Sequence, residues 1–203
     1  MTVQGTPETN GAPIDPRLLA GAEQVLAEHG LEGVTLERLS AASGLSRMTL
    51  HRRRVTTRSV VAALVEAAAG EYLAGVLPAL TSTGDAEHRL RAVLVAIFDV
   101  ADRHLALLAG LFPRPDSVFH EPKAGPGPVD TDELFSRPIA RLLRDGAADG
   151  TLRAVPDPDR AAVVLFNVVG WGYVHLRHAQ RWGPEQARAD LLDLGLRGLL
   201  PAS

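Results

Sequence analysis

The chain of 203 residues holds 21 Lys and Arg against 24 Asp and Glu, which gives a net charge of −3, and 46% of its residues are hydrophobic. That apolar content is ample for a hydrophobic core and excludes disorder of the whole chain. Because the chain has no cysteine, disulfides and thiolate metal sites are excluded, and a cytoplasmic location is expected.

Apolar residues recur at helical spacing along almost the whole chain, which predicts an all-α protein of about nine helices. The first helix is expected from about Asp15 to His29, and Gly30 should end it. Thr35 is placed to cap a short second helix, which Gly44 should break. Ser46 is placed to cap a third. Three short helices thus fit within about 40 residues.

Four more helices are predicted in the middle of the chain. The fourth begins at Thr56 or Thr57 and should stop at Pro78, because proline lacks the N–H that a helix interior needs. The fifth and sixth are expected over residues 85–101 and 104–112. Five prolines in residues 113–131 predict an irregular loop. The seventh helix is expected over residues 131–149.

Two apolar helices end the chain. Asp157 and Pro158 predict the start of the eighth, which should run to about Arg181, and the ninth should span about 184–199. Their apolar surface is broader than one domain can cover, which indicates a partner subunit. We therefore expect a homodimer with a two-fold, four-helix interface. The interface is expected to include Val164, Val168, Gly172, His175, Leu191 and Leu194.

Positive charge is concentrated in one short window. Residues 34–60 hold six arginines and one acid, a local charge of +5, whereas the segments on either side each carry −4. The six are Arg38, Arg47, Arg52, Arg53, Arg54 and Arg58. A local basic patch in an acidic chain suits a polyanion better than a metabolite.

The same window has the form of a helix-turn-helix, in which Gly permits a tight turn and apolar residues fix the angle between two helices. Those roles fit Leu39, Ser40, Gly44, Leu45 and Leu50. The pattern predicts double-stranded DNA as a partner.

Residues from about Asp15 to Leu77 resemble the N-terminal domain of TetR-family transcriptional regulators, most closely over "AEQVLAEHGLEGVTLERLSAASGLSRMTL". The nine-helix plan and "DGTLRAVPDPDRAAVVLFNVVGWG" resemble the regulatory domain of that family. The resemblance implies a homodimeric repressor that binds a palindromic operator and is released by a small-molecule effector. It also implies a flexible arm over residues 1–14, a DNA-binding domain over 15–60 and a helical regulatory and dimerisation domain over 61–203.

The resemblance implies which side chains meet DNA. By position, the residues that face the major groove or its edges are Arg47, Met48, Thr49, His51, Arg52 and Arg53, and Thr35 meets a phosphate. Arg47 can make a bidentate contact to guanine or a phosphate contact. Arg54 joins Arg52 and Arg53 as a phosphate ligand or as part of a solvated run, and Arg58 can replace the lysine usual in the family.

One departure from the family pattern concerns the core of the small domain. The family usually has an aromatic pair where this chain has His51-Arg52-Arg53. Those aromatics normally close the core, so we expect Leu50, Val55 and Val60 to compensate for them.

The effector is expected to be small and largely hydrophobic, because the regulatory helices mix aromatic with a few polar residues. The candidates are Phe98, Asp102, Phe112, Phe135, Ile139, Phe166, Asn167 and Trp171. Each is alternatively an ordinary core residue. Asn167 stands out because a buried amide needs hydrogen-bond partners, from a neighbour or a ligand.

Other classes of function find no support in the sequence. It has no Gly-rich phosphate loop and no nucleophile, carboxylate and His arrangement, so we expect no enzyme and no cofactor. His175 and His178 lack a third ligand, so no metal site is expected. The most apolar segment, 161–174, is too short to cross a membrane. The alternative function is a helical small-molecule-binding protein of the same fold that has lost operator binding.

Overall fold

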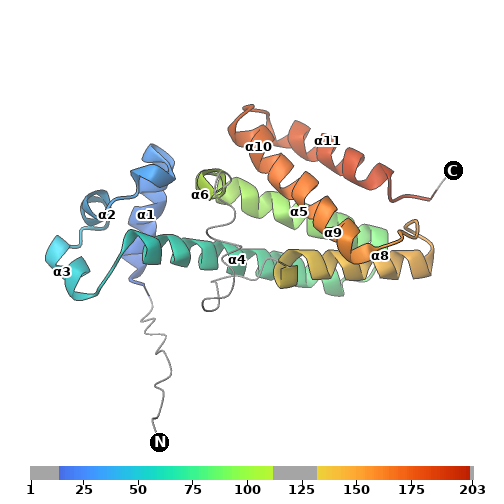
Figure 1. Ribbon diagram of the computed structural model, residues 1–203, viewed down its shortest axis with the longest axis horizontal. Coiled ribbons are helices and arrows are strands. Elements are labelled where there is room, and N and C mark those ends of the chain that lie inside the picture. The colour runs from blue at the N-terminus through green and yellow to red at the C-terminus, as the bar shows by residue number, and fades with distance from the viewer. Residues whose placement is uncertain (1–13, 112–131, 202–203) are drawn as a thin grey trace, which may run out of the picture.

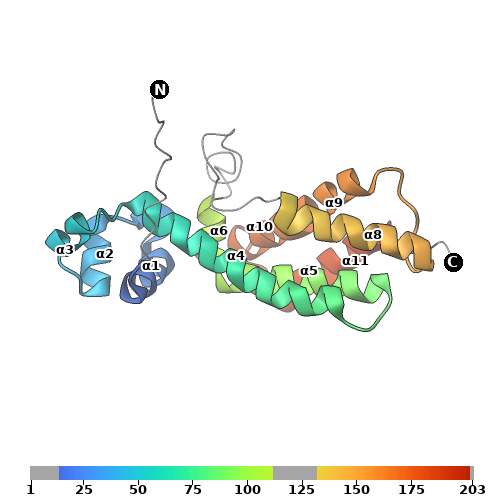
Figure 2. The ribbon, with the colours of Figure 1, turned by 90° about the horizontal axis from the view of Figure 1, so that it is seen from below.

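The computed structural model describes residues 14–111 and 132–201, and every regular element within them is a helix. The prediction of an all-α protein is therefore confirmed. Figure 1 shows two parts side by side: α1, α2 and α3 form a small group at one end, and α5, α8, α9, α10 and α11 form a larger bundle at the other. Helix α4 runs from the first part into the second, as the turned view also shows (Figure 2).

The N-terminal helices begin where the capping residues predict. The bounds are Pro16–His29 for α1, Leu31–Gly33 for the single turn η1, Leu36–Ser43 for α2 and Arg47–Arg52 for α3. The side chains of Asp15, Thr35 and Ser46 accept hydrogen bonds from backbone N–H groups in the first turns of α1, α2 and α3. Gly30, with φ 67°, ends α1 as expected.

Helix α4 spans Thr57–Thr81, and the Thr56 and Ser59 side chains form a reciprocal capping box at its start. The expectation that Pro78 ends this helix is wrong, because Pro78 lies inside it. Pro78 occurs in the last turn and leaves only the carbonyl of Ala74 without an N–H partner. Both residues are exposed, so water can replace the lost bond.

The larger part contains α5 (Ala86–Arg103), α6 (Leu105–Leu111), the π-helical turn η2 (Asp132–Ser136), α8 (Arg137–Asp149), α9 (Pro158–Phe166), the π-helical turn η3 (Asn167–Trp171), α10 (Gly172–His178) and α11 (Pro184–Arg197). The expected loop over 113–131 lies outside the described residues.

The predicted eighth helix corresponds to α9, η3 and α10 in succession, and it ends three residues before the expected Arg181. The chain turns there because the N–H of Trp182 donates to the carbonyl of Leu176 at 3.0 Å. Arg181 takes a left-handed conformation with φ 59° within this turn. The bond gives a partner to one of the carbonyls that a helix C-terminus leaves without an intrahelical N–H.

Two hydrophobic clusters form the cores, and α4 contributes to both. The smaller cluster includes Leu18, Leu39 and Leu50 together with Val60 and Leu64 at the start of α4. The larger cluster takes its residues from Ala68 onward along α4 and from α5, α8, α9, η3, α10 and α11. The boundary expected at residue 60 therefore falls within a helix that both cores share.

Helix α4 is the one described helix that is long and apolar enough, by length and composition, to cross a membrane. It packs on α5 and α1 and supplies residues to both cores. Long core helices of water-soluble proteins pass the same test, so the helix does not indicate a membrane protein.

Candidate DNA-binding surface and effector cavity

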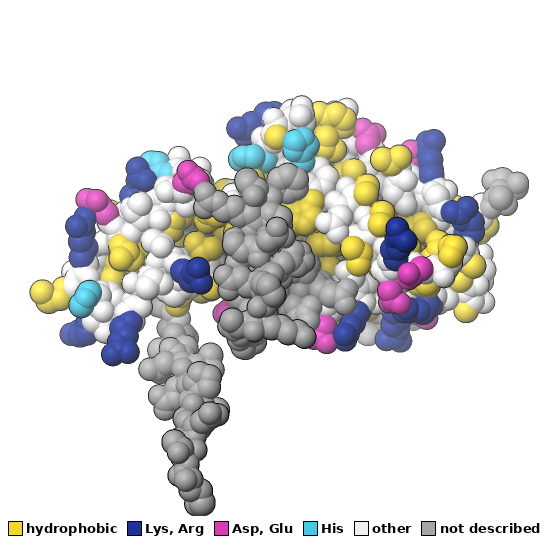
Figure 3. All heavy atoms as spheres, in the orientation of Figure 1, with side chains coloured by type: hydrophobic (Ala, Val, Ile, Leu, Met, Phe, Trp, Pro, Cys, Tyr) yellow, Lys and Arg dark blue, Asp and Glu magenta, His cyan; other side chains and the backbone are white. Residues whose placement is uncertain are grey.

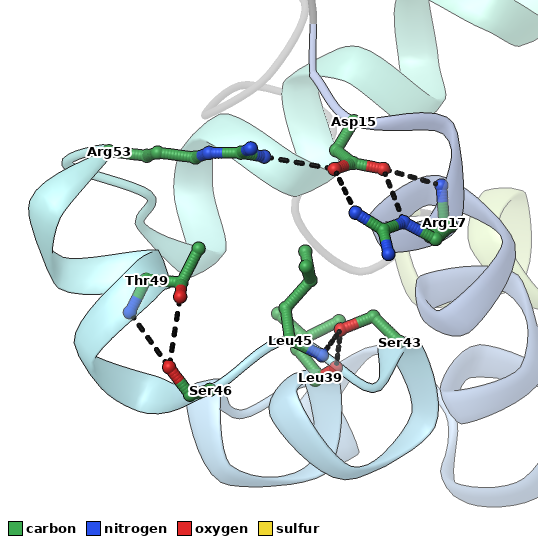
Figure 4. Close-up of polar contacts among 8 residues, drawn as sticks. All are labelled: Asp15, Arg17, Leu39, Ser43, Leu45, Ser46, Thr49 and Arg53. Atoms are coloured by element: carbon green, nitrogen blue, oxygen red, sulfur yellow. Dashed lines mark hydrogen bonds and ion pairs between the residues drawn. The ribbon is translucent and has the colours of Figure 1, made fainter.

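The turn between α2 and α3 is fixed by serine side chains and one glycine (Figure 4). Gly44 takes a left-handed conformation with φ 69°, which glycine adopts without strain. The Ser43 hydroxyl donates to the carbonyl of Leu39 at 2.6 Å and accepts from the N–H of Leu45 at 3.3 Å. The Ser40 hydroxyl donates to the carbonyl of Leu45 at 2.6 Å. These bonds hold α3 at a defined angle to α2.

Helix α3 presents its polar face to solvent. Its cap residue Ser46 accepts from the N–H of Thr49 at 3.1 Å and lies 2.9 Å from the Thr49 hydroxyl. Met48 is 81% exposed. His51 is exposed as well.

Two of the predicted DNA-binding arginines are paired with acids. Arg47 lies 2.7 Å from the carboxylate of Glu37, and both side chains are largely exposed. Arg53 at the end of α3 donates to Asp15 at the start of α1 over 2.9 Å (Figure 4). Hydrogen bonds from Arg17 and Arg53 hold the pKa of Asp15 well below its usual range.

The other arginines of the patch are not paired in this way. Arg52, Arg54 and Arg58 are exposed and form no ion pair with any residue that the structure describes. Arg54 has a positive φ of 52°, and its N–H donates to the carbonyl of His51 at 2.9 Å. Basic side chains gather at the end of the molecule that α2 and α3 form (Figure 3). They border a hollow lined by Leu36, Glu37, Arg47, Leu50, His51, Arg52, Arg54, Val55 and Thr56.

The small core closes without the aromatic pair of the family pattern. Leu50 and Val60 are fully buried, and the N–H of Val55 bonds back to the carbonyl of Leu50 at 3.0 Å. The sequence pattern did not predict the further contribution of α6, whose Leu107 and Leu111 join this core. The larger part of the molecule thus contributes side chains to the core of the small domain.

A cavity lies between α4, α5, α6, η2 and the α9 to α10 segment. It is lined by Val65, Ala68, Ala69, Tyr72, Ile97, Val100, Ala101, Leu107, Leu108, Leu134, Phe135, Phe166, Gly170, Trp171 and Val174. The predicted pocket residues Phe135, Phe166 and Trp171 are among them. Tyr72 was not predicted, because it follows the heptad-like spacing of ordinary core residues in α4.

The remaining predicted pocket residues lie elsewhere. Phe98 and Ile139 are fully buried in the core and do not line the cavity. The expectation that Asn167 is a buried amide is wrong, since Asn167 is exposed and its amide donates to the carbonyl of Val163 at 2.8 Å. Phe112 lies outside the described residues.

Asp102 belongs to a cluster that joins α5, α10 and α11. Its carboxylate accepts from Tyr173 at 2.6 Å, Arg177 at 2.9 Å and Arg188 at 2.6 Å. Arg188 also donates to Asp99 at 2.7 Å. Burial raises the pKa of Asp102, but the three hydrogen bonds outweigh burial and lower it overall.

The predicted dimer residues divide by exposure. Val164 is 55% exposed, Val168 45% and Leu194 66%, which makes them an apolar surface on α9, η3 and α11. Leu191 is 7% exposed and lies in the core, where it faces Gly172. His175 is exposed. Among the described residues, no three His, Asp or Glu side chains are grouped to hold a metal ion.

Comparisons with known proteins agree with this geometry. Residues 18–64 match the family model described as bacterial regulatory proteins, tetR family. An uncharacterised HTH-type transcriptional regulator of Mycobacterium tuberculosis is 31% identical over 83 residues, which are 41% of this chain and 42% of that relative. The match therefore spans less than half of the relative's length.

Solved structures extend the likeness in fold to nearly the whole chain. The ketosteroid transcriptional regulator KstR2 of Mycobacterium tuberculosis matches with a TM-score of 0.72 at 19% identity, over 95% of this chain and 98% of its own. AibR, solved in complex with isovaleryl coenzyme A and operator DNA, matches with a TM-score of 0.63 at 16% identity. The match covers 87% of this chain and 95% of AibR. The fold is that of TetR-family regulators.

Proposed function

We propose that this chain, whose N-terminal helix-turn-helix domain belongs to the TetR family of bacterial regulatory proteins, is a ligand-responsive repressor that binds operator DNA. The observation that carries the proposal is the surface around α3, where capped helices present Met48, His51 and unpaired arginines to solvent. Phosphate contacts by such arginines orient a protein on DNA, and groove contacts supply sequence preference.

A palindromic operator follows from the proposed dimer. A two-fold axis through α9, η3 and α11 would present two α3 helices in opposite senses, so the half-sites would be inverted repeats. The exposed Val164, Val168 and Leu194 support that axis. We propose that the protein acts in the cytoplasm, without catalytic activity.

The apolar cavity supports release by a small hydrophobic effector. Val65 and Leu107 line the cavity and also belong to the small core. A ligand that moves either side chain therefore acts on the domain that carries α3. The complex of AibR with isovaleryl coenzyme A and operator DNA is a precedent for both kinds of ligand on this fold.

The direct test is a gel shift with the DNA upstream of the protein's own gene, repeated over a range of salt concentrations. If the dimer neutralises about six phosphates, the logarithm of the association constant falls with log salt at a slope near −5. The slope separates phosphate contact from weak apolar association. A flat salt dependence would contradict the assignment of this surface to DNA.

One observation favours the alternative function. Arg47 and Arg53 are engaged by Glu37 and Asp15, so both pairs must rearrange before these arginines can bind phosphate. A binding protein that has lost its operator would keep such pairs. It would bind apolar ligands in the cavity and give no shift with its upstream DNA at any salt concentration.

A further inference from the structure

The Tyr72 hydroxyl is buried without a hydrogen-bond partner. The side chain is 1% exposed, and its oxygen contacts no donor or acceptor among the described residues. Buried hydroxyls are nearly always paired, because an unpaired one loses its bonds to water and gains nothing in return. The unpaired oxygen belongs to a residue that lines the cavity.

The second tyrosine of the chain shows that the fold pairs a buried hydroxyl elsewhere. Tyr173 is also fully buried, but its hydroxyl donates to Asp102 at 2.6 Å and accepts from Arg188 at 3.2 Å. Both tyrosines lie in the same large core. The difference between them is that Tyr72 faces the cavity.

Aromatic neighbours hold the Tyr72 ring in place. Its centroid lies 4.4 Å from that of Phe135, and Phe135 stacks on Phe166 at the same separation. The three rings form one wall of the cavity. Burial raises the pKa of Tyr72, so the hydroxyl keeps its proton at neutral pH and can donate a hydrogen bond.

The rest of the cavity selects against charge. None of the described lining residues is Asp, Glu, Lys, Arg or His, and besides Tyr72 only Trp171 has a polar atom in its side chain. A carboxylate or ammonium group placed there would lose its hydration without gaining an ion partner. The cavity has a volume of about 70 Å³, so a small organic molecule enters it only if the lining side chains shift to make room.

We infer that the effector is an uncharged, mainly apolar molecule with one oxygen, carbonyl or hydroxyl, that accepts a hydrogen bond from Tyr72. This inference rests on the proposed role of the cavity as the effector site. It goes further by naming the polar group of the ligand and its anchor. The hydrogen bond from Tyr72 gives an oxygenated ligand a higher affinity than a hydrocarbon of the same shape. The apolar walls disfavour the binding of acids.

Three probes of similar shape test the inference: 4-tert-butylacetophenone, the hydrocarbon 4-isopropyl-tert-butylbenzene, and 4-tert-butylbenzoate. Binding is followed by tryptophan fluorescence, because Trp171 lines the cavity. The ketone should bind, and the benzoate should bind at least tenfold more weakly. In Tyr72→Phe the ketone should lose about 3- to 10-fold in affinity, as expected for one hydrogen bond, whereas the hydrocarbon should stay within about twofold.

Tyr173→Phe is the matched control. It removes a paired hydroxyl, so it should lower the melting temperature and leave the ratio of ketone to hydrocarbon affinity unchanged. Tyr72→Phe should not lower the melting temperature of the ligand-free protein, because no hydrogen bond is lost. A lower melting temperature in Tyr72→Phe would show that the hydroxyl is already paired, and would overturn the inference.

The other outcomes separate the two proposals. If the wild type binds all three probes and Tyr72→Phe weakens the ketone and the hydrocarbon equally, the cavity is a ligand site but Tyr72 is not its anchor. If the wild type binds none of them, the cavity is not an effector site for molecules of this class. The proposed role of the cavity and the inference about Tyr72 then both fail. Preferred binding of the benzoate overturns the inference alone.

Discussion

At the scale of single residues, the arginines of the basic patch differ in ways that their spacing did not indicate. Arg47 and Arg53 are held by acids, whereas Arg52, Arg54 and Arg58 form no ion pair within the described part of the chain. Arg53 connects the end of α3 to the start of α1, and its partner Asp15 is also the cap of α1. A charge count treats these arginines alike, but only the unpaired ones are available to DNA without rearrangement.

Arg54 gives a test at this scale. Its φ of 52° is unfavourable for any residue with a Cβ, so Arg54→Gly should leave stability unchanged or raise it by about 1 kcal/mol. The same change should weaken DNA binding and reduce the salt slope by about 2 per dimer, since each protomer loses one phosphate contact. Chemical denaturation and salt-dependent gel shifts measure the two effects.

Arg181 is the matched control, because it has a similar φ of 59° and lies in the turn before α11. Arg181→Gly should give the same small change in stability and no change in DNA binding. If Arg54→Gly keeps the full salt slope, Arg54 is a solvated charge and not a phosphate ligand.

At the scale of elements, helix starts were predictable and some helix ends were not. Asp15, Thr35, Ser46 and Asp157 each cap the helix that follows, because a cap depends only on neighbouring residues. The ends after Pro78 and His178 depend on more distant contacts. Pro78 is tolerated in the last turn of α4, and α10 is closed by a bond from Trp182.

The candidate sites, like the helix ends, divide into features set by neighbouring residues and features set by distant contacts. The sequence predicted α3 as the DNA-facing helix because its cap, turn glycine and basic residues are local signals. Tyr72 and the partners of Asp102 lie far apart in sequence from the residues that they contact, and no local pattern indicates such pairings. Phe98 and Phe166 carry the same side chain, yet only Phe166 reaches the cavity.

The crossing of α1 and α2 requires a glycine. A Cβ built on Gly21 would lie 2.9 Å from the backbone nitrogen of Ser43, which cannot move without shifting α2. Gly21→Ala should therefore destabilise the protein by about 1 to 3 kcal/mol, although alanine is the better helix former.

Gly70→Ala in α4 is the control, because a Cβ there meets nothing within 4 Å. It should stabilise by about 0.5 to 1 kcal/mol. Equal effects in urea denaturation would contradict the close crossing.

The cluster around Asp102 should make stability depend on pH. Its pKa is lowered by folding, so its contribution is complete above the unfolded value of about 3.9 and is lost as pH falls through the folded value. Asp102→Asn should cost about 1 to 3 kcal/mol at neutral pH. The difference in the free energy of unfolding between Asp102→Asn and wild type should become smaller below about pH 4.

Asp193→Asn provides the comparison, because Asp193 forms an exposed pair with Arg197 within α11. That change should cost less than about 0.5 kcal/mol. A constant difference between Asp102→Asn and wild type from pH 7 to pH 3 would show that Asp102 is not stabilised as a carboxylate.

At the scale of the whole molecule, the two parts are joined more closely than two separate domains would be. Helix α4 supplies residues to both cores, and α6 of the larger part contributes to the core of the small one. The sequence predicted the two parts from the helix-turn-helix pattern. It did not predict that α6 contributes to the small core, because that contact joins Leu107 and Leu111 to residues many positions earlier in the chain.

The exposed apolar surface on α9, η3 and α11 gives the last prediction. Val164 is 55% exposed and Leu194 66%, so both face solvent in a single chain. A charge at either position would be buried unpaired in the proposed interface, which strongly opposes association. Val164→Glu and Leu194→Glu should therefore convert a dimer to a monomer at micromolar concentration in light scattering.

Leu77→Glu is the control, since Leu77 on α4 is 56% exposed and lies outside this surface. The two monomeric variants should also lose most of their affinity for a two-half-site operator, because each half-site is then bound alone. A wild-type chain that is monomeric at micromolar concentration would contradict the proposed interface and, with it, the palindromic operator.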